Sequence, residues 1–374
     1  MKPLCYAPFI GLYVSTRSGF APCCVSKKFE DVGPEEFWTG ETMKSIREQL
    51  LNGKFPDSCS LCRKKIEDGL DSDVQHWQNE FDNSPVLINV ETGNYTDGPI
   101  YLDYRPSNQC NLKCRMCGTS ASSSIEREVI NNPELSKWYG KPRQDKDLSA
   151  KMNDYVLNIE LEKIKILGGE PSVDPTVWDF METIAKLKDK PTLRITTNGT
   201  SLNKHFRNVI DKFDKLEVVF SVDAIYETYE YIRTNADWHK TAQQIESFMT
   251  ERRDVKYGFN VVLSPWNIFA LGELVDWFDE LRFKGYEFKV YFDNSDDEVT
   301  SLSAVLPQHI QQAIDSINMA QLDKLTGGSN LIRILRAAKF NQESHDSFKR
   351  FASALDRIRR THITKIDYRF MEYV

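Results

Sequence analysis

Three cysteines of this 374-residue chain stand close together as Cys110, Cys114 and Cys117, a C-x3-C-x2-C group. Thiolates bind soft metals, and a four-iron cluster normally takes one cysteine per iron. Three cysteines therefore leave one iron open, where a cosubstrate could bind the metal directly. A zinc site that borrows a fourth ligand, or a chance grouping, is the alternative interpretation.

Five further cysteines lie near the N-terminus, and no cysteine follows Cys117. They are Cys5, Cys23, Cys24, Cys59 and Cys62. A C-x2-C pair serves iron-sulfur clusters and zinc alike, so this group indicates a second metal site without fixing the metal. Adjacent side chains point in different directions, and we expect only one of Cys23 and Cys24 to be a ligand.

The elements that must position these residues alternate between strands and helices from residue 100 onward. The expected strands are Ile100–Tyr104, Lys163–Leu167, Leu193–Thr197, Leu216–Val222, Gly258–Leu263 and Phe288–Phe292. The expected helices include Val177–Leu187, Trp238–Thr250, Leu271–Phe283 and Pro307–Ile317. This alternation predicts an α/β fold with a parallel sheet, whose ligands bind at the carboxyl ends of the strands.

A polar, turn-rich stretch separates the two groups of cysteines, with turn signals at Asp82–Pro85 and Asp97–Pro99. We therefore place a domain boundary near residue 90. Residues 1–90 would form a small cysteine-rich metal-binding domain with its linker, and residues 91–300 the α/β domain. Residues 301–374 would be a C-terminal helical extension that packs on the α/β domain and contains an amphipathic helix over residues 345–360.

Composition and charge exclude several classes of protein. Apolar residues make up 40% and charged residues 28% of the chain, which suits a soluble, packed domain. The net charge is −7 without a basic block, so nothing marks a nucleic-acid surface. The sequence shows no apolar run near the roughly 20 residues of a membrane span, and Met1–Phe9 does not read as a secretion signal. We expect a cytoplasmic protein with reduced cysteines and no membrane partner.

The group Cys110, Cys114 and Cys117, directly after a predicted strand, resembles the signature of the radical S-adenosylmethionine (SAM) superfamily. Two later segments, each at the end of a strand, resemble its GGEP and TNG elements: Gly168-Gly169-Glu170-Pro171 and Thr196-Thr197-Asn198-Gly199. Ser221, Asp223, Arg233 and Asn267 fall where the family contacts SAM. Met116 stands where an aromatic residue often lies near adenine. The resemblance covers roughly residues 100–295 and implies a partial (β/α)6 TIM-like barrel.

What the resemblance implies is an enzyme that holds a catalytic [4Fe-4S] cluster on the three cysteines. In that family an electron from the cluster cleaves SAM to methionine and a 5′-deoxyadenosyl radical, which removes hydrogen from a substrate. The implied SAM contacts are Gly168, Gly169, Glu170, Asn198, Ser221, Arg233, Asn267 and Met116. A low-potential electron donor such as a flavodoxin or ferredoxin is also implied, whereas the catalytic residues stay unknown.

The N-terminal cysteines resemble a twitch domain, the shorter relative of the SPASM domain that carries auxiliary clusters in many peptide-modifying members. Those domains usually follow the barrel, and here the cysteines come first. The resemblance implies an auxiliary [4Fe-4S] cluster on Cys5, Cys23, Cys59 and Cys62, with a structural four-cysteine zinc site as the alternative. It also implies a peptide or protein substrate, which could be oxidised, crosslinked or epimerised. A small molecule or nucleoside is the second choice of substrate, and a non-catalytic zinc-binding interaction protein is the remote alternative.

Overall fold

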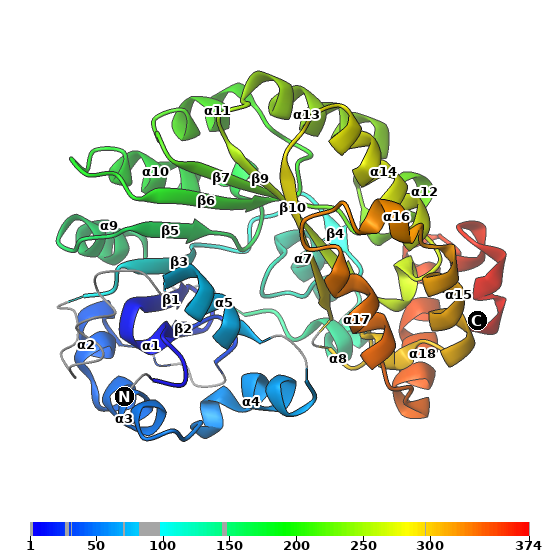
Figure 1. The fold of residues 1–374 in the computed structure, drawn as a ribbon, viewed down its shortest axis with the longest axis horizontal. Helices are drawn as coiled ribbons and strands as arrows, with labels where there is room; N and C mark the ends of the chain where they lie inside the picture. Colours follow the sequence, from blue (N-terminus) through cyan, green and yellow to red (C-terminus); the bar gives the residue numbers. More distant parts are fainter. Residues whose placement is uncertain are drawn as a thin grey trace. The chain divides into compact units, whose positions relative to one another are not determined.

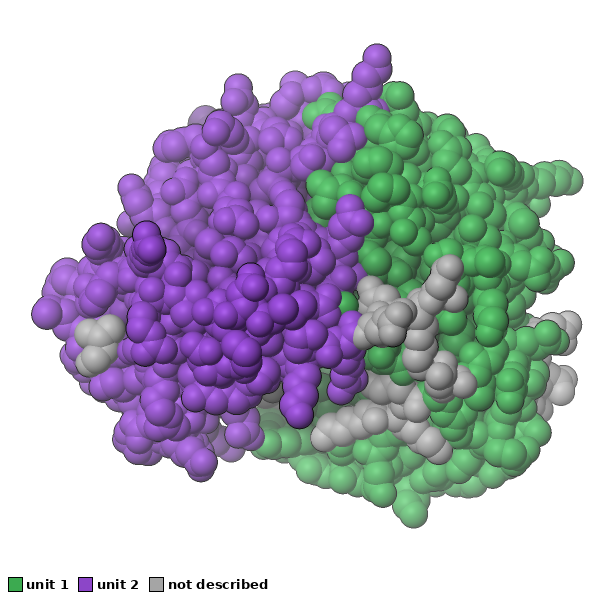
Figure 2. Space-filling view, turned by 180° about the vertical axis from the view of Figure 1, so that it is seen from behind, with its two compact units in different colours: residues 1–107, 144–195, 205–216 green, residues 108–143, 196–204, 217–374 purple. Residues whose placement is uncertain are grey.

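The computed structural model describes residues 3–26, 30, 32–69, 72–81, 98–143, 148–295 and 297–373. The chain divides into two compact units (Figure 2). Unit 1 comprises residues 1–107, 144–195 and 205–216, and unit 2 comprises residues 108–143, 196–204 and 217–374. The domain boundary predicted near residue 90 lies outside the described residues.

Unit 1 contains strands in the order β6-β5-β3-β1-β2 (Figure 1). They are β1 (Gly11–Ser15), β2 (Gly19–Ala21), β3 (Tyr101–Arg105), β5 (Lys163–Ile166) and β6 (Thr192–Thr197), the last two residues of β6 belonging to unit 2. β1 pairs with β3, β3 with β5 and β5 with β6 in parallel, whereas β2 runs antiparallel to β1. The N-terminal cysteines thus flank a hairpin whose first strand is a member of the mostly parallel sheet.

The hairpin of β1 and β2 is missing from the sequence-based prediction. Every residue of both strands is buried, so no alternation of polar and apolar residues marks them. Gly19, the first residue of β2, follows the turn with φ 91°, a conformation that favours glycine.

Short helices surround the strands of unit 1. They are α1 (Ala7–Ile10), α2 (Pro34–Thr39), α3 (Glu41–Leu51), α4 (Ser60–Glu67), α5 (Asp73–Phe81), α9 (Ser149–Leu157), α10 (Pro175–Ile184) and α11 (Lys204–Ile210, whose first residue belongs to unit 2), with 3-10 turns η1 (Asp57–Cys59) and η3 (Pro171–Val173). Helix α10 begins at Pro175, two residues before the predicted Val177. Asp174 caps the helix, because its Oδ1 accepts a hydrogen bond from Thr176 N at 2.9 Å, and proline suits the first turn of a helix. Helix α5 packs on β3 through Trp77, whose ring lies 4.8 Å from that of Tyr101.

Unit 2 contains three parallel strands in the order β10-β9-β7 and a separate antiparallel pair. The strands are β7 (Leu216–Ser221, whose first residue belongs to unit 1), β9 (Lys256–Leu263) and β10 (Phe288–Asn294), and the separate pair is β4 (Lys113–Cys114) with β8 (Arg233–Thr234).

The helices of unit 2 cover its strands. They are α7 (Ser123–Asn131), α8 (Ser136–Tyr139), α12 (Tyr226–Ile232), α13 (Trp238–Glu251), α14 (Leu271–Phe283), α15 (Pro307–Ser316), α16 (Met319–Leu322), α17 (Ser329–Ala337) and α18 (Gln342–Arg359). The 3-10 turns are η2 (Pro133–Leu135), η4 (Pro265–Asn267), η5 (Leu302–Ala304), η6 (Ile363–Lys365) and η7 (Tyr368–Tyr373). Phe259 of β9 lies 5.4 Å from Trp277 and 5.1 Å from Phe278 of α14, ring centroid to ring centroid, and is fully buried. Burying a phenylalanine stabilises the fold by about 1.5–3 kcal/mol, so these aromatic contacts fix α14 on the strand.

The predicted α/β fold with a mostly parallel sheet is confirmed. All six predicted strands are present, as β3, β5, β6, β7, β9 and β10, with ends that differ by one or two residues. Helix α14 has the predicted bounds, and α18 contains most of the predicted helix over residues 345–360. Within the described ranges, no helix has the length and apolar character that crossing a membrane requires.

Candidate metal centre

The three-cysteine loop is held at its middle cysteine by the short β4–β8 ladder of unit 2. This pairing sets Cys114 opposite Arg233, and the next residue, Arg115, donates its backbone N–H to Ile232 O at 2.9 Å. Cys117 N donates to Cys114 O at 3.1 Å, which closes a turn between the second and third cysteines. The spacing of two residues between these cysteines is therefore the spacing of a hydrogen-bonded turn.

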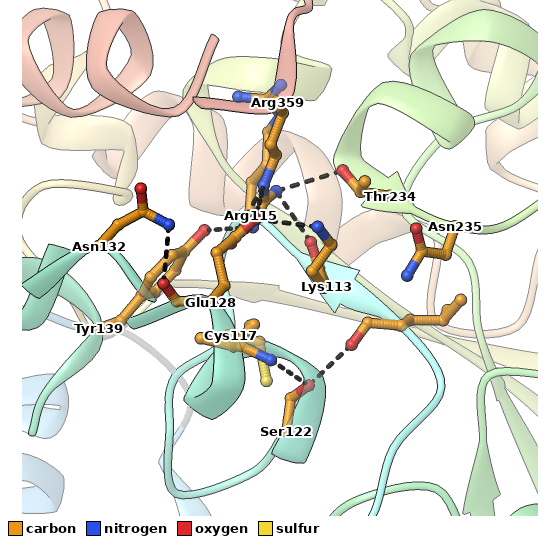
Figure 3. A network of polar contacts seen from close by, with 12 residues as sticks. Lys113, Arg115, Cys117, Ser122, Glu128, Asn132, Tyr139, Thr234, Asn235 and Arg359 are labelled. Carbon is orange, nitrogen blue, oxygen red and sulfur yellow. Dashed lines mark hydrogen bonds and ion pairs between the residues drawn. The ribbon is translucent and has the colours of Figure 1, made fainter. Parts of the chain in front are cut away.

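The first cysteine is held by the start of α7. Cys110 O accepts a hydrogen bond from Ser124 Oγ at 2.8 Å, and Cys110 N donates to Ser123 Oγ at 3.2 Å. Leu112 N donates to Cys110 Sγ at 3.4 Å, an N–H···S contact that favours the thiolate. Ser122 caps α7 by accepting from Ile125 N and also donates to Leu112 O at 2.7 Å, so one side chain orders both the helix and the loop (Figure 3).

Arg233 brings a positive charge to this loop. Its Nη1 lies 3.8 Å from Cys114 Sγ, and its Nη2 lies 2.7 Å from Asp223 Oδ2. The guanidinium is buried, and its pKa is raised: burial alone would lower it, but the charges of Asp223 and Cys114 outweigh that effect. Arg233 therefore stays charged beside the sulfur, and its contact with SAM stays a prediction.

Asn267 is fully buried and holds the ends of two strands together. Its Nδ2 donates to Asp223 O and Val262 O at 2.9 Å each, and its Oδ1 accepts from Ser264 N at 2.9 Å. These bonds orient Asp223, whose Oδ1 also accepts from Val262 N at 2.9 Å. The observed task of Asn267 is thus to position the carboxylate that binds Arg233.

Asn198 contacts the cysteine loop directly. It is buried, and its Nδ2 donates to the Oδ1 of Asn111 at 3.0 Å, the residue that follows Cys110. Its Oδ1 accepts from Thr200 N at 2.9 Å. Of the other predicted contacts in unit 2, Met116 lies within the loop and Ser221 ends β7, both partly exposed.

Gly168, Gly169 and Glu170 belong to unit 1, where they follow β5. Both glycines have positive φ, 88° and 56°, and a Cβ on Gly168 would lie 2.8 Å from Cβ of Arg105. The Glu170 carboxylate is buried and accepts from Ser172 N at 3.0 Å and Ser172 Oγ at 2.6 Å, which caps the following 3-10 turn. The glycines are therefore required by the backbone itself, and any contact of this turn with SAM stays a prediction.

A second layer of residues from α18 holds the loop from its other side, and sequence reasoning missed it. Arg115 is fully buried and donates from Nη2 to Asp356 Oδ1 at 2.9 Å, and its guanidinium carbon lies 3.5 Å from the ring centroid of Tyr231. Arg359 donates to Lys113 O at 2.9 Å and forms an ion pair with Glu128 at 2.6 Å (Figure 3). The residues on both sides of Cys114 are thus fixed by one C-terminal helix.

The donor set of this loop fits an iron-sulfur cluster. All three cysteines are free thiols and partly exposed. Burial raises the pKa of Cys114 to about 12, even though Arg233 opposes the shift, and burial raises the pKa of Cys117 as well. Such thiols become thiolates when a metal supplies further positive charge. Among the described residues, no three His, Cys, Asp or Glu side chains already have the geometry of a metal site.

The N-terminal cysteines meet at one cavity of unit 1. Its lining includes all four predicted ligands, Cys5, Cys23, Cys59 and Cys62, with mainly apolar neighbours. Burial is the main cause of the raised pKa of each thiol, which reaches about 11 at Cys62, and the neighbouring cysteines raise it further at Cys5, Cys23 and Cys62. The four cysteines therefore line one cavity, where burial favours the neutral thiols until a metal ion binds.

Cys24 points elsewhere. It lines a second cavity, shared with Cys23, that also includes Asp103 and Lys165. Cys23 lines the cavity of the other three predicted ligands and Cys24 does not, which favours Cys23 as the ligand, and ligation itself stays a prediction.

A row of charged side chains across the sheet of unit 1 was also missed from the sequence. The strand registers place Asp103 of β3 opposite Lys165 of β5, and Lys165 opposite Arg194 of β6. Lys165 Nζ lies 3.2 Å from Asp103 Oδ2, and Arg105 Nε lies 3.5 Å from the other oxygen. Three cations thus accompany one carboxylate beside the cavity that Cys24 lines. The sequence shows charged residues inside the predicted strands, which could have indicated this row. Only the strand register shows that these residues lie opposite one another.

Comparison with known proteins supports the family resemblance. Residues 104–278 match the Radical SAM superfamily. The GTP 3′,8-cyclase of Streptomyces coelicolor is 27% identical over 113 residues, which are 29% of this chain and 29% of that protein. GTP 3′,8-cyclase 1 of Mycobacterium tuberculosis strain H37Rv is 35% identical over 102 residues, or 25% of this chain and 24% of that protein. The matches to these curated relatives therefore span well under half of their length.

Two solved structures are similar to this chain at low sequence identity. The structure of Streptococcus suis SuiB bound to S-adenosylmethionine has a TM-score of 0.43 and 17% identity, covering 80% of this chain and 67% of that chain. The structure of native anSMEcpe with bound AdoMet and Cp18Cys peptide has a TM-score of 0.40 and 19% identity, covering 60% of this chain and 58% of that chain.

Proposed function

We propose, from the match of residues 104–278 to the Radical SAM superfamily, that the protein is an enzyme that cleaves SAM reductively. Cys110, Cys114 and Cys117 would hold a [4Fe-4S] cluster with one open iron. The observation that carries the proposal is the pairing of Cys114 with Arg233, on a loop that also presents the other two thiols. When bound, the cluster supplies the electron that splits SAM into methionine and a 5′-deoxyadenosyl radical.

The residues of the chain would orient and shield the cofactors. Arg233 keeps a positive charge beside Cys114, which stabilises a thiolate ligand. Asp223 and Asn267 position that guanidinium, and Asn198 steadies the loop through Asn111. The proposed SAM contacts are the ones inferred from the sequence: Gly168, Gly169, Glu170, Asn198, Ser221, Arg233, Asn267 and Met116.

We further propose an auxiliary [4Fe-4S] cluster on Cys5, Cys23, Cys59 and Cys62, in a twitch-like N-terminal domain over residues 1–90. Their shared cavity supports this assignment, and four-cysteine zinc is the alternative that the same cavity admits. Residues 91–300 would be the barrel domain and residues 301–374 its helical extension. Reduced thiols and oxygen-sensitive clusters suit the cytoplasm.

For the substrate we propose a peptide or protein, on the resemblance of the N-terminal cysteines to auxiliary-cluster domains. A second candidate is an anionic small molecule such as a nucleotide. Two observations favour it: Arg105, Lys165 and Arg194 accompany one carboxylate at Asp103, and curated relatives are named as GTP 3′,8-cyclases. Adding GTP to the reduced enzyme with SAM, and measuring whether 5′-deoxyadenosine rises together with a new nucleotide product, separates the two.

The test of the main proposal is anaerobic reconstitution followed by iron and sulfide analysis and a 5′-deoxyadenosine assay with dithionite and SAM. We expect about eight irons, four for each cluster. Changing Cys110, Cys114 and Cys117 to alanine should remove about four irons and all 5′-deoxyadenosine. The matched control is Cys24→Ala, outside both predicted ligand sets, which should keep both. Bound zinc without iron-sulfur absorbance, or a fully loaded wild type that makes no 5′-deoxyadenosine, would overturn the proposal.

A further inference from the structure

An open groove of about 500 Å³ runs between α8 and α18 of unit 2, helices that lie side by side (Figure 1). Its lining consists of Glu134, Lys137, Trp138, Lys349, Arg350, Ser353, Ala354 and Arg357. The groove is separate from both groups of cysteines in its lining, and no residue of the proposed SAM site takes part in it.

The groove is strongly basic on a chain whose net charge is −7. Its four cations, Lys137, Lys349, Arg350 and Arg357, face a single carboxylate, Glu134. None of these cations forms an ion pair with another residue in the part of the chain that the structure describes. Among the same described residues, Arg350 donates to Ser347 Oγ at 2.9 Å, Lys349 Nζ donates to Glu372 O at 3.5 Å, and Lys137 lies over the Trp138 ring at 3.9 Å. Their charges are therefore available to a partner.

The groove backs directly onto the three-cysteine loop. Trp138 in its lining packs on Phe351 of α18 at 5.0 Å, and the next residue, Tyr139, accepts from Thr119 N at 2.9 Å. Thr119 is two residues from Cys117, and a Cβ on the intervening Gly118 would lie 3.1 Å from Tyr139 O. Helix α8 thus packs against the backbone beside the third cysteine.

The same relation holds on the α18 side. Arg357 in the groove adjoins Asp356, which binds Arg115, and lies two residues before Arg359, which binds Lys113 O. Arg115 and Lys113 flank Cys114. Tyr139, Asp356 and Arg359 thus connect the two helices that line the groove to residues next to Cys114 and Cys117.

We propose that this groove is the docking surface for an acidic electron-donor protein that reduces the catalytic cluster. The inference rests on the proposed function, in which each SAM cleavage consumes one electron that must come from outside the chain. A cluster held by Cys110, Cys114 and Cys117 would accept one electron from the reduced cofactor of the donor, and the donor would depart oxidised by one electron. Basic charge speeds the encounter with an acidic partner. The contacts of Tyr139, Asp356 and Arg359 would give the electron a path from the groove to the three-cysteine loop.

The experiment uses the reconstituted full chain and two reductants. The groove variant is Lys349→Glu/Arg350→Glu/Arg357→Glu, and 5′-deoxyadenosine formation is measured with flavodoxin reduced by its reductase and, separately, with dithionite. We expect the flavodoxin-driven rate at low ionic strength to fall about tenfold or more, because steering by charge commonly contributes that much. The dithionite-driven rate should change less than about twofold, since a small reductant needs no docking surface.

The matched control is Arg253→Glu/Lys256→Glu/Lys324→Glu, which reverses three exposed cations of unit 2 outside the groove. It should keep both rates. Equal losses of flavodoxin-driven turnover in the two variants, or an unchanged rate in the groove variant, would overturn the docking proposal. So would a groove variant that keeps flavodoxin-driven turnover but loses binding of a single-stranded oligonucleotide.

If the triple groove variant does not fold, Arg350→Glu alone gives the answer, because this exposed residue donates one hydrogen bond to a neighbouring serine. We expect it to lower the flavodoxin-driven rate about threefold with the dithionite-driven rate unchanged, and no change would count against the groove. A wild type that is inactive with dithionite overturns the proposed function instead, so the two failures are distinguishable.

Discussion

Replacing Arg359 with alanine should destabilise unit 2 by about 3 kcal/mol. The guanidinium is buried and donates to Lys113 O at 2.9 Å, Tyr139 OH at 3.1 Å and the Glu128 carboxylate at 2.6 Å. Removing one partner of a buried ion pair costs about 3–5 kcal/mol because it leaves an uncompensated charge. Lys113 Nζ still lies 2.9 Å from Glu128, so we expect the lower end of that range.

The assay is thermal unfolding of the reconstituted protein, followed by far-ultraviolet circular dichroism. At about 2 °C per kcal/mol for a chain of this size, the midpoint should fall by about 6 °C. The matched control is Arg357→Ala, two residues earlier on α18 and exposed, which should stay within about 0.5 kcal/mol of the wild type. The double variant Arg359→Ala/Glu128→Gln should recover part of the loss, because it removes the stranded carboxylate.

The effect should also depend on pH. Burial alone would raise the pKa of Glu128, but the hydrogen bonds and charge of Arg359 outweigh that effect. In the folded protein the pKa of Glu128 therefore lies below its ordinary value of 4.5. A carboxyl whose folded pKa is depressed stabilises the protein above its unfolded pKa and loses that contribution as the pH falls through the folded value. The difference in stability between wild type and Arg359→Ala should therefore be largest at neutral pH and should decrease below pH 4.5.

Two results would refute this reasoning about Arg359. An Arg359→Ala midpoint equal to that of Arg357→Ala would mean that the buried guanidinium contributes nothing. A destabilisation that stays constant into acid would mean that packing of the side chain, rather than its ion pair with Glu128, carries the effect.

Three further predictions concern other positions. In chemical denaturation, Gly168→Ala should lower the free energy of unfolding by about 2 kcal/mol more than Gly53→Ala does. Both glycines have positive φ, but only at Gly168 would a Cβ lie 2.8 Å from a neighbouring atom. Equal losses in the two variants would contradict the clash. Iron analysis should show that Cys59→Ala loses about four irons and that Cys24→Ala keeps them. Loss of iron from Cys24→Ala alone would mean that Cys24 is a ligand and Cys59 is not. Asn267→Ala should lower the unfolding free energy by about 2–4 kcal/mol even without SAM, because it strands buried backbone groups, and destabilisation seen only with SAM present would point to a contact with the cofactor instead.

Much of the fold was predictable because its strands are separated by helices long enough to show their own period. The strands β3, β5, β6, β7, β9 and β10 were found this way, whereas β1 was not. Gly11–Ser15 is buried on both faces and only five residues long, so it carries neither alternation nor helical period. Its partner strand β3 lies about ninety residues later in the chain, and no feature of the nearby sequence predicts that the two strands pair.

The candidate site divides in the same way. Cys110, Cys114 and Cys117 follow from spacing within eight residues, and the shared cavity agrees with the grouping of the four N-terminal cysteines. The bond from Arg115 to Asp356 joins residues 241 positions apart, and an arginine beside a cysteine does not name its partner. Asp103 and Lys165 align only through strand register, which the sequence of each strand leaves open.

The parallel pairing of β1 with β3 has a consequence for synthesis of the chain on the ribosome. Gly11 pairs with Tyr101, so the first strand is made ninety residues before its partner in the sheet. At about 5–20 residues per second, the β1–β2 hairpin waits roughly 5–18 seconds with one edge open. During that interval its apolar edge and the neighbouring thiols are exposed to other nascent chains and to oxidants. High-level expression should therefore depend on slow synthesis or on chaperones that cover this hairpin until Tyr101–Arg105 emerges.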